Sequence, residues 1–170
     1  MKIHIIGVSG SGKTYLARLL SQKYNIPHYD LDDVFWDNSS NGYNKKNPHE
    51  KREALLKDIL RNDDWIIEGV YYSWVAEAFS KADSIILLDL PKSVYKFRII
   101  LRFFRKKLGV ERQGKKETVK ALLSLLKWTD KFQKVNLPNI YTLLEKHKDK
   151  TIVLSSAKEV NDYIKQNNNF

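Results

Sequence analysis

Apolar residues along the chain fall into two alternating patterns, short unbroken runs and longer stretches with helical spacing. The short runs predict buried parallel strands at residues 2–6, 25–30, 65–69, 84–89 and 151–154. The stretches between them predict helices at about residues 13–24, 47–61, 72–82, 91–108, 116–132 and 138–147, with a last helix after Ser156. Because strands alternate with helices throughout, the pattern predicts an α/β fold with a parallel sheet and helices on both faces.

Capping signals mark several helix ends. Asn47 and Glu50 fit a capping box around Pro48, and Ser156 with Glu159 fits another at the last helix. The longest predicted helix opens at Pro91 and stops at Gly109. Along it, an apolar stripe is formed by Val94, Phe97, Leu101, Phe104 and Leu108.

A glycine-rich loop joins the first predicted strand to the first helix. Residues 7–14 read G-x-x-x-x-G-K-T, the pattern of a phosphate-binding P-loop, in the strand–loop–helix context that the pattern requires. Its glycines let the backbone approach a ligand, so that amides from Ser9 to Thr14 can donate to phosphate oxygens. Lys13 can reach the terminal phosphates, and the Thr14 hydroxyl can ligate magnesium. We therefore expect Mg²⁺ and a nucleotide, the latter bound by Gly7, Ser9, Gly10, Ser11, Gly12, Lys13 and Thr14.

Acidic residues stand at the carboxyl ends of three predicted strands, where open α/β sheets bind ligands. Asp30 and Asp32 follow the second strand and, two positions apart in an extended chain, present their carboxylates together. A polar loop or a helix N-cap is the alternative for this pair. The third strand ends near Glu68 and the fourth at Asp89, and either acid fits the one that contacts magnesium in P-loop proteins. The local pattern leaves this choice open.

The segment after the second strand holds candidates for contacts with a second substrate. Trp36 precedes a polar loop at residues 37–47 and Tyr43 lies in it; both fit either stacking on a base or a place in the core or as loop anchors. Arg52, on the following helix, fits either a substrate phosphate or a solvated surface position.

Composition narrows the class of protein. With 170 residues and 42% apolar content, the chain fits one domain. It has no cysteine, which excludes disulfides and thiolate metal sites and agrees with a reducing cytoplasm. No apolar run approaches the roughly 20 residues needed to cross a bilayer, so we expect no membrane partner. The net charge of +10 suits nucleotides, nucleic acids or another anionic partner.

Much of the positive charge lies in and after the longest helix. Only Glu111 and Glu117 oppose a run of cations made of Lys92, Lys96, Arg98, Arg102, Arg105, Lys106, Lys107, Arg112, Lys115 and Lys116. This run fits a solvated basic face, a set of substrate-phosphate contacts or a nucleic-acid patch.

Four stretches together resemble the P-loop kinases related to adenylate kinase, and more narrowly the FlaR-like "topology modulation" proteins. They are the glycine loop, Ile26–Asp32 (IPHYDLD), Trp65–Gly69 (WIIEG) and Leu88–Pro91 (LDLP). The resemblance covers almost the whole chain. It implies a P-loop fold of three α/β/α layers, with a five-stranded parallel sheet in order 2-3-1-4-5 and a helical lid. Within one domain over 1–170, it implies an acceptor-binding region at about 32–62 and the lid at about 98–133.

The resemblance also implies roles for individual residues. Glu68 matches the third-strand acid that helps to hold magnesium, and Ser155–Lys158 matches the loop that runs past adenine, which makes ATP the expected nucleotide. By position, Arg98, Arg102 and Arg105 match arginines that clamp phosphates when the lid closes. We therefore expect catalytic roles for Lys13, Asp32, Arg102 and Arg105, nucleotide contacts from Arg98 and Ala157, and metal contacts from Thr14, Asp30 and Glu68.

The third strand departs from the D-G-F-P-R sequence of adenylate kinases. Here it continues Glu68-Gly69-Val70-Tyr71-Tyr72, so the arginine that grips the acceptor phosphate is missing, which counts against AMP as acceptor. The leading hypothesis is phosphoryl transfer from ATP–Mg²⁺ to a small acceptor such as a nucleoside monophosphate.

Two other functions fit the sequence. In a small-alcohol or nucleoside kinase, Asp30 or Asp32 would orient the acceptor hydroxyl, as a general base does. A nucleotide-gated nucleic-acid-binding or regulatory protein is the alternative from another class, although no DNA-binding motif is present. We expect a cytoplasmic monomer or dimer that binds nucleic acid only weakly.

Overall fold

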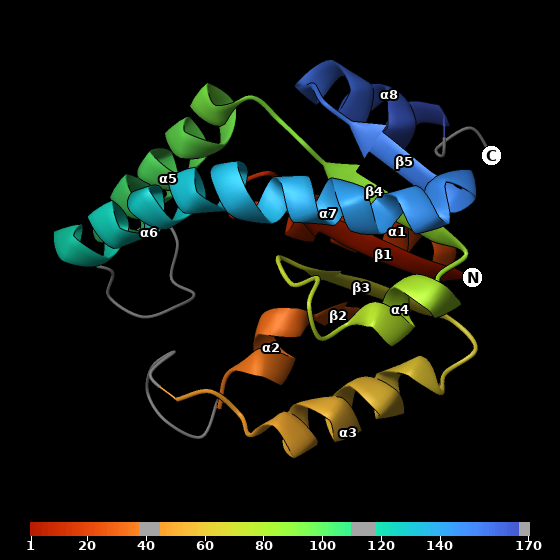
Figure 1. The fold of residues 1–170 in the computed structure, drawn as a ribbon. Coiled ribbons are helices and arrows are strands. Elements are labelled where there is room, and N and C mark those ends of the chain that lie inside the picture. Colours follow the sequence, from red (N-terminus) through yellow and green to blue (C-terminus); the bar gives the residue numbers. More distant parts are fainter. Residues whose placement is uncertain (38–44, 110–117, 167–170) are drawn as a thin grey trace.

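The chain folds around one sheet with helices on both of its faces (Figure 1), as seen in a computed structural model that describes residues 1–37, 45–109 and 118–166. The strands are β1 (Lys2–Gly7), β2 (His28–Asp30), β3 (Trp65–Gly69), β4 (Ser84–Leu88) and β5 (Thr151–Leu154). The α-helices are α1 (Lys13–Tyr24), α2 (Leu31–Phe35), α3 (His49–Leu60), α4 (Ala76–Lys81), α5 (Lys92–Lys107), α6 (Val119–Lys131), α7 (Leu137–Leu144) and α8 (Ala157–Gln166).

The sheet is parallel throughout, with strand order β2-β3-β1-β4-β5. This confirms the parallel α/β fold that the sequence predicts and the strand order that the resemblance implies. In the register, Asp30 at the end of β2 pairs with Glu68 on β3, and Ile6 on β1 pairs with Gly69. The carboxyl ends of β1, β2 and β3 therefore meet at one edge of the sheet, directly below the glycine loop.

Each face of the sheet carries its own core because successive strand residues point to opposite sides. On β1, Ile3 and Ile5 pack with Leu16, Leu20 and the inner face of α8. Ile6, on the other face, belongs to the cluster that includes α3, α4, α5 and α7. The layers place α1 on one face and α4 and α7 on the other, as three-layer packing requires.

His4 is an exception among these apolar residues. It lies on β1 with 0% exposure, and its ring stacks on Phe79 of α4 at 4.2 Å between centroids. Neither ring nitrogen has a hydrogen-bond partner in the part of the chain that the structure describes. Burial therefore lowers the pKa of His4 from 6.5 to about 3, so the ring is neutral at physiological pH.

Three local predictions were wrong. Asn47 does not cap α3; its buried amide instead donates to the carbonyl oxygens of Val34 and Trp36 and ties the chain to the end of α2. The helix predicted at 72–82 forms only at Ala76–Lys81. The helices predicted around Pro138 are continuous, because a π-helical segment, Phe132–Asn136, joins α6 to α7.

Helix α5 begins after Pro91 and ends before Gly109, whose φ of +72° fits a helix stop, as predicted. The helix does not bury the apolar stripe that is evident in its sequence. Phe97, Phe104 and Leu108 are 64%, 53% and 77% exposed, whereas the residues buried on α5 are Tyr95, Ile99 and Phe103.

Candidate functional site

The glycine loop between β1 and α1 has the backbone shape that its sequence predicts. Gly10 and Gly12 have φ angles of +81° and +104°, in the left-handed region that favours glycine. A Cβ on Gly10 would lie 2.7 Å from the carbonyl oxygen of Tyr95, so the close approach of α5 also requires glycine here. The side-chain oxygen of Ser11 is buried without a hydrogen-bond partner among the described residues. An unpaired polar atom and an open backbone turn fit a phosphate group.

Lys13 opens α1 and is almost buried, at 8% exposure. Its ammonium donates to the carbonyl oxygen of Val8 at 3.2 Å and lies 4.0 Å from Glu68 Oε2. Burial lowers the pKa of Lys13, and the negative charges of Glu68 and Asp32 oppose that change. These acids help to retain a positive charge where the loop would hold a terminal phosphate.

Thr14 and Glu68 meet beside this lysine. The Thr14 hydroxyl donates to Glu68 Oε1 at 2.5 Å, and Glu68 is 2% exposed. Asp89, the other candidate for the magnesium-contacting acid, instead accepts a hydrogen bond from the Tyr141 hydroxyl at 2.7 Å. Of the two acids, Glu68 is therefore the one in contact with the loop. Its carboxylate and the Thr14 hydroxyl are hard oxygen donors, which fit Mg²⁺.

Asp30 and Asp32 come together differently from the prediction. Asp32 lies in the first turn of α2 rather than in an extended chain, and Asp30 is the N-cap, whose Oδ1 accepts from the Asp32 amide at 2.9 Å. The helix-cap alternative is therefore correct for Asp30. Burial, and then the charge of Glu68, raises the pKa of Asp30 to about 7. Asp32 Oδ1 accepts from the Tyr71 hydroxyl at 2.7 Å, which fixes this carboxylate near the loop.

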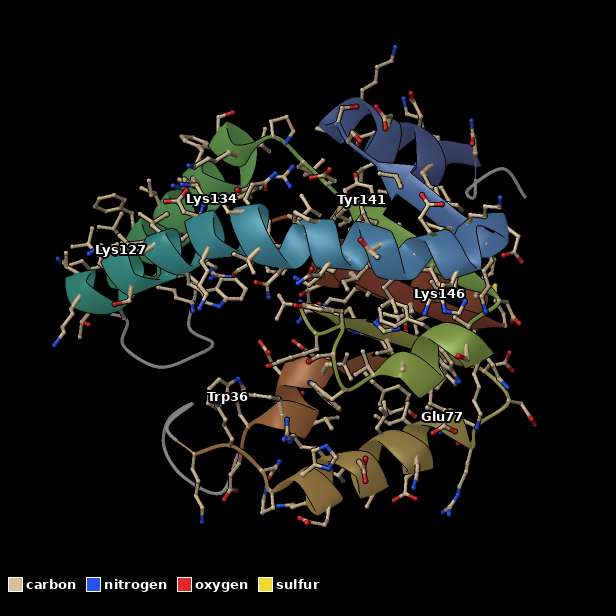
Figure 2. All side chains as sticks on the ribbon, in the orientation of Figure 1. Trp36, Glu77, Lys127, Lys134, Tyr141 and Lys146 are labelled. Carbon is tan, nitrogen blue, oxygen red and sulfur yellow. The ribbon has the colours of Figure 1, made fainter. Side chains whose placement is uncertain are left out.

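An aromatic cluster continues from Tyr71 away from the loop. The Tyr71 ring stacks on Phe35 at 4.6 Å between centroids, and Trp74 lies 5.4 Å from Tyr71 and 6.2 Å from Phe35. The Arg52 guanidinium lies over this cluster, 4.9 Å from the Phe35 centroid and 5.5 Å from that of Trp74. Trp36, labelled in Figure 2, contacts Phe35 edge-on at 5.0 Å.

The three arginines of α5 occupy different positions relative to the loop. Arg98 donates to the Ser11 carbonyl oxygen at 2.9 Å. Arg102 is half-buried, its Nε has no partner among the described residues, and its charge contributes to lowering the pKa of Lys13. Arg105 is exposed. The structure thus brings Arg98 and Arg102 to the loop and leaves Arg105 at the surface.

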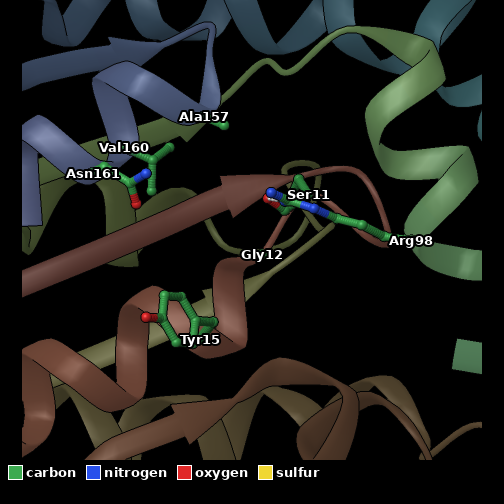
Figure 3. Close-up of a pocket in the computed structure, with 7 residues that line it drawn as sticks. All are labelled: Ser11, Gly12, Tyr15, Arg98, Ala157, Val160 and Asn161. Atoms are coloured by element: carbon green, nitrogen blue, oxygen red, sulfur yellow. Dashed lines mark hydrogen bonds between the residues drawn. The ribbon is translucent and has the colours of Figure 1, made fainter. Parts of the chain in front are cut away.

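A cavity of about 300 Å³ opens beside the loop (Figure 3). Arg98 reaches it from α5, and Ala157 lines it from the start of α8. Residues of the loop, α1 and α8 complete its wall: Ser11, Gly12, Tyr15, Val160 and Asn161. Ala157, which the resemblance assigns to the loop that runs past adenine, thus lies in the wall of a cavity next to the glycine loop. The capping box that orients this loop is formed, with Glu159 bonded to the Ser155 amide and to Ser156.

Sequence reasoning missed the part of the site formed by Tyr71 and Trp74 and left Arg52 undecided. Tyr71 and Trp74 lie in the connection between β3 and α4, Arg52 lies on α3, and no local sequence motif connects them. The departure from D-G-F-P-R was the available signal, because it places Tyr71 and Tyr72 where related kinases have other residues. Tyr43, at residues 38–44, and Arg112, at residues 110–117, lie outside the described residues.

The model of the AAA domain family matches residues 3–120, which contain the glycine loop, Asp32, Glu68 and the arginines of α5. The chain belongs to this AAA-domain family. Its sequence is also related to adenylate kinases, which confirms the resemblance to P-loop kinases.

Two relatives show how far the sequence similarity extends. The uncharacterized protein YqaC of Bacillus subtilis is 31% identical over 104 residues, covering 61% of this chain and 57% of that protein. Adenylate kinase of Clostridium kluyveri is 29% identical over 119 residues, covering 55% of each. The matches thus span little more than half the length of these relatives.

Among solved structures, shikimate kinase from Bacteroides thetaiotaomicron superposes with a TM-score of 0.51 over 98% of this chain and 95% of that one. The sequence identity is 15%, so this likeness shows the shared fold alone. No helix in the described part of the chain is both long and apolar enough to span a membrane.

Proposed function

We propose that the protein transfers the γ-phosphoryl group of ATP to a small acceptor. The observation that carries this proposal is the convergence of Lys13, Thr14 and Glu68 at the glycine loop, with Asp32 on the acceptor side. Phosphoryl transfer needs little covalent chemistry from a protein, since positioning and charge stabilisation supply most of the rate. This arrangement provides both.

The donor side binds and orients ATP. The loop amides and Ser11 contact the phosphates, Arg98 and Ala157 lie along the nucleotide cavity, and Lys13 neutralises charge on the transferring group. Arg102 adds a second cation near Lys13, while the exposed Arg105 would join only when the α5 region closes over the nucleotide. We propose that the lid spans residues 98–133, of which 110–117 lie outside the described residues.

Thr14 and Glu68 would hold Mg²⁺, with Asp30 as a neighbouring acid. When bound, this ion neutralises phosphate charge and aligns the phosphate oxygens. No group of three or more His, Cys, Asp or Glu residues within the described ranges is arranged to hold a metal alone. Ligands from the nucleotide and water would therefore complete the site, as is usual for Mg²⁺.

The acceptor side is the region at about 32–62 together with Tyr71. Asp32 is held by the Tyr71 hydroxyl and stands close enough to Lys13 to influence its pKa. In this position its carboxylate can orient an acceptor group and take its proton. The acceptor is either a nucleoside monophosphate or a small alcohol or nucleoside.

ATP turnover with a panel of acceptors, with and without duplex DNA, tests the proposal. Release of ADP that depends on an acceptor and is lost in Lys13→Ala supports a kinase. DNA-dependent hydrolysis that no acceptor stimulates would instead support a nucleotide-gated regulatory protein. Weak DNA binding alone discriminates nothing, since a net charge of +10 attracts any polyanion.

A further inference from the structure

We propose that the outer face of α5, together with the first turns of α6, docks on the surface of an anionic lipid bilayer. The proposal goes beyond the proposed function and does not depend on it. Three features carry it: an exposed apolar stripe, cations along both borders of that stripe, and the position of the two helices at the margin of the fold.

The apolar stripe of α5 lies on the outside of the protein. Five large apolar side chains are exposed on it: Phe97, Ile100, Leu101, Phe104 and Leu108. Their spacing of three and four positions places them on one face of the helix. Phe97 and Leu101 each follow a buried residue, Tyr95 and Ile99, by two positions. Two positions turn a helix by about 200°, so the stripe points away from the core.

Cations border this stripe on both sides. The exposed Arg105 lies along one border, which Arg98 continues toward the glycine loop. The exposed Lys107 lies along the other border, which Lys96 continues toward the start of the helix. A helix that lies in the interface of a bilayer has this arrangement, because its apolar side chains enter the acyl region while the charged ends of flanking side chains reach the headgroups.

Acidic residues do not balance the charge of this surface. Helix α5 contains none, and Asp130 is the one acid within α6. The Asp130 carboxylate accepts from the Lys96 ammonium at 2.9 Å and also pairs with Lys92. Helix α6 adds three further cations, Lys120, Lys127 and Lys131. The surface is therefore complementary in charge to an anionic partner.

The first turns of α6 extend the apolar surface. Val119 and Leu123 are exposed, and they precede Asp130 by eleven and seven residues. This spacing places them on the face of α6 that meets α5, since Asp130 contacts α5 through Lys92 and Lys96. Figure 1 shows the end of α5 and the start of α6 at the margin of the molecule, beyond the strands. A surface at the margin can meet a plane without obstruction from the sheet.

The side chains of the stripe decide between anionic partners. Single-stranded nucleic acid stacks its bases on aromatic rings, and Ile100, Leu101 and Leu108 offer no ring. A second copy of this chain would bring cations of the same sign together across the stripe. An anionic bilayer supplies both an apolar layer for the stripe and headgroups for Arg105 and Lys107. The expectation of no membrane partner concerns spanning segments, which docking on the surface does not require.

Flotation with vesicles of two compositions tests the proposal. The whole chain is mixed at physiological salt with vesicles of phosphatidylcholine alone, or of phosphatidylcholine with about 30 mol% phosphatidylserine. We expect binding to the anionic vesicles only. Phe104→Gln keeps the charge and should weaken that binding by about tenfold or more, because it removes an inserted ring. Val153→Gln, at an exposed position on β5, is the matched control and should bind as the wild type does.

A second pair of variants tests the cations. Changing Arg105 and Lys107 together to Gln should weaken binding to the anionic vesicles by about tenfold or more. The matched control changes Lys51 and Lys57 on α3 to Gln, because it lowers the net charge equally at two exposed positions far from the stripe. Melting temperatures verify that all variants are folded.

A fluorescent label distinguishes insertion from attraction by charge alone. The chain has no cysteine, so Leu108→Cys provides one attachment site for a polarity-sensitive fluorophore. Its emission should shift to shorter wavelength on the anionic vesicles, whereas the same label on Val153→Cys should not respond.

Three results would each overturn the proposal. The first is no vesicle binding, or equal binding to both compositions. The second is equal affinity in the wild type and Phe104→Gln, or a label at position 108 that stays in water while the protein is bound. The third is binding of a single-stranded oligonucleotide that Phe104→Gln weakens tenfold while vesicles are not bound, which would assign the surface to nucleic acid.

Discussion

The proposed donor side and the proposed acceptor side of this site are built in different ways. The donor side is one contiguous loop, residues 7–14, whose backbone conformation follows from its glycines. The acceptor side is assembled from side chains of separate segments, with Asp32 from α2, Arg52 from α3 and Tyr71 from the chain after β3. Backbone amides bind phosphate in the same way in many proteins, whereas side chains determine which acceptor fits.

The comparison indicates how such a protein can retain its phosphate chemistry while its acceptor changes. Replacing a residue of the loop alters turns that only glycine tolerates. Replacing Phe35 at the end of α2, Arg52 near the start of α3 or Trp74 before α4 alters an aromatic cluster that lies outside the loop. We therefore expect donor-side changes to abolish turnover and acceptor-side changes to alter the choice of acceptor.

The largest effect is expected for Lys13→Ala. It removes the cation beside the transferring phosphoryl group, and turnover should fall by about a thousandfold or more. Circular dichroism and melting temperature should show a folded protein, because the buried ammonium has only one hydrogen bond, to Val8, among the described residues. An unchanged rate would reject the P-loop mechanism.

Asp32→Asn should reduce turnover by about a hundredfold, the usual size of a lost general base. The KM for ATP should change little, since Asp32 lies on the acceptor side. Tyr71→Phe removes the hydrogen bond that holds Asp32 and should have a smaller effect, with a raised KM for the acceptor. If either variant loses stability but retains activity, the carboxylate is structural.

The arginines of α5 allow a matched test of the lid. Arg102→Lys keeps the charge but loses the planar fork of donors, and we expect turnover to fall by about tenfold or more. Arg105→Lys is the comparison, since Arg105 is exposed and the structure shows no contact between it and the loop. Similar rates for both variants and the wild type, together with tight DNA binding at physiological salt that responds to ATP, would favour the regulatory alternative.

The smallest expected effect concerns stability rather than turnover. His4 has a folded pKa of about 3, below its unfolded value of 6.5, so the unfolded chain binds the additional proton between these values. Stability should fall as the pH falls through 6.5, and at pH 5.5 the contribution of His4 is a loss of about 1.4 kcal/mol. Denaturant unfolding at pH 7.5 and 5.5 measures this, and His4→Leu should remove that part of the pH dependence. Identical pH dependence in both proteins would contradict it.

The sequence predicted the strands of the sheet well because each is a short apolar run between helices, and the resemblance to P-loop kinases supplied their order. Helix α5 shows where pattern reasoning fails. It has apolar residues around most of its circumference, and the stripe with Phe97 and Phe104 is as regular as the buried set with Ile99 and Phe103. Only contacts distant in sequence, such as Arg98 with Ser11, decide which side faces the protein.

The candidate site divides in the same way. The loop residues and Thr14 could be named from a local motif, whereas the choice of Glu68 over Asp89 came from the resemblance. The geometry brings Thr14 and Glu68 together. The proximity of Asp32 was expected for a wrong reason, since a helix rather than an extended chain places it. Tyr71 and Trp74 could not be assigned from the sequence. They follow β3, and their role depends on packing against Phe35, which ends α2 after the neighbouring strand β2.

A crystal structure with AMP-PNP and Mg²⁺ tests the central claim, that the two sides meet at Lys13 and Asp32, most directly. We predict the γ-phosphate within contact of the Lys13 ammonium, Mg²⁺ at the Thr14 hydroxyl in place of its present hydrogen bond to Glu68, and the Asp32 carboxylate facing the γ-phosphate. A triphosphate bound away from the glycine loop, or a γ-phosphate directed away from Asp32, would contradict the account.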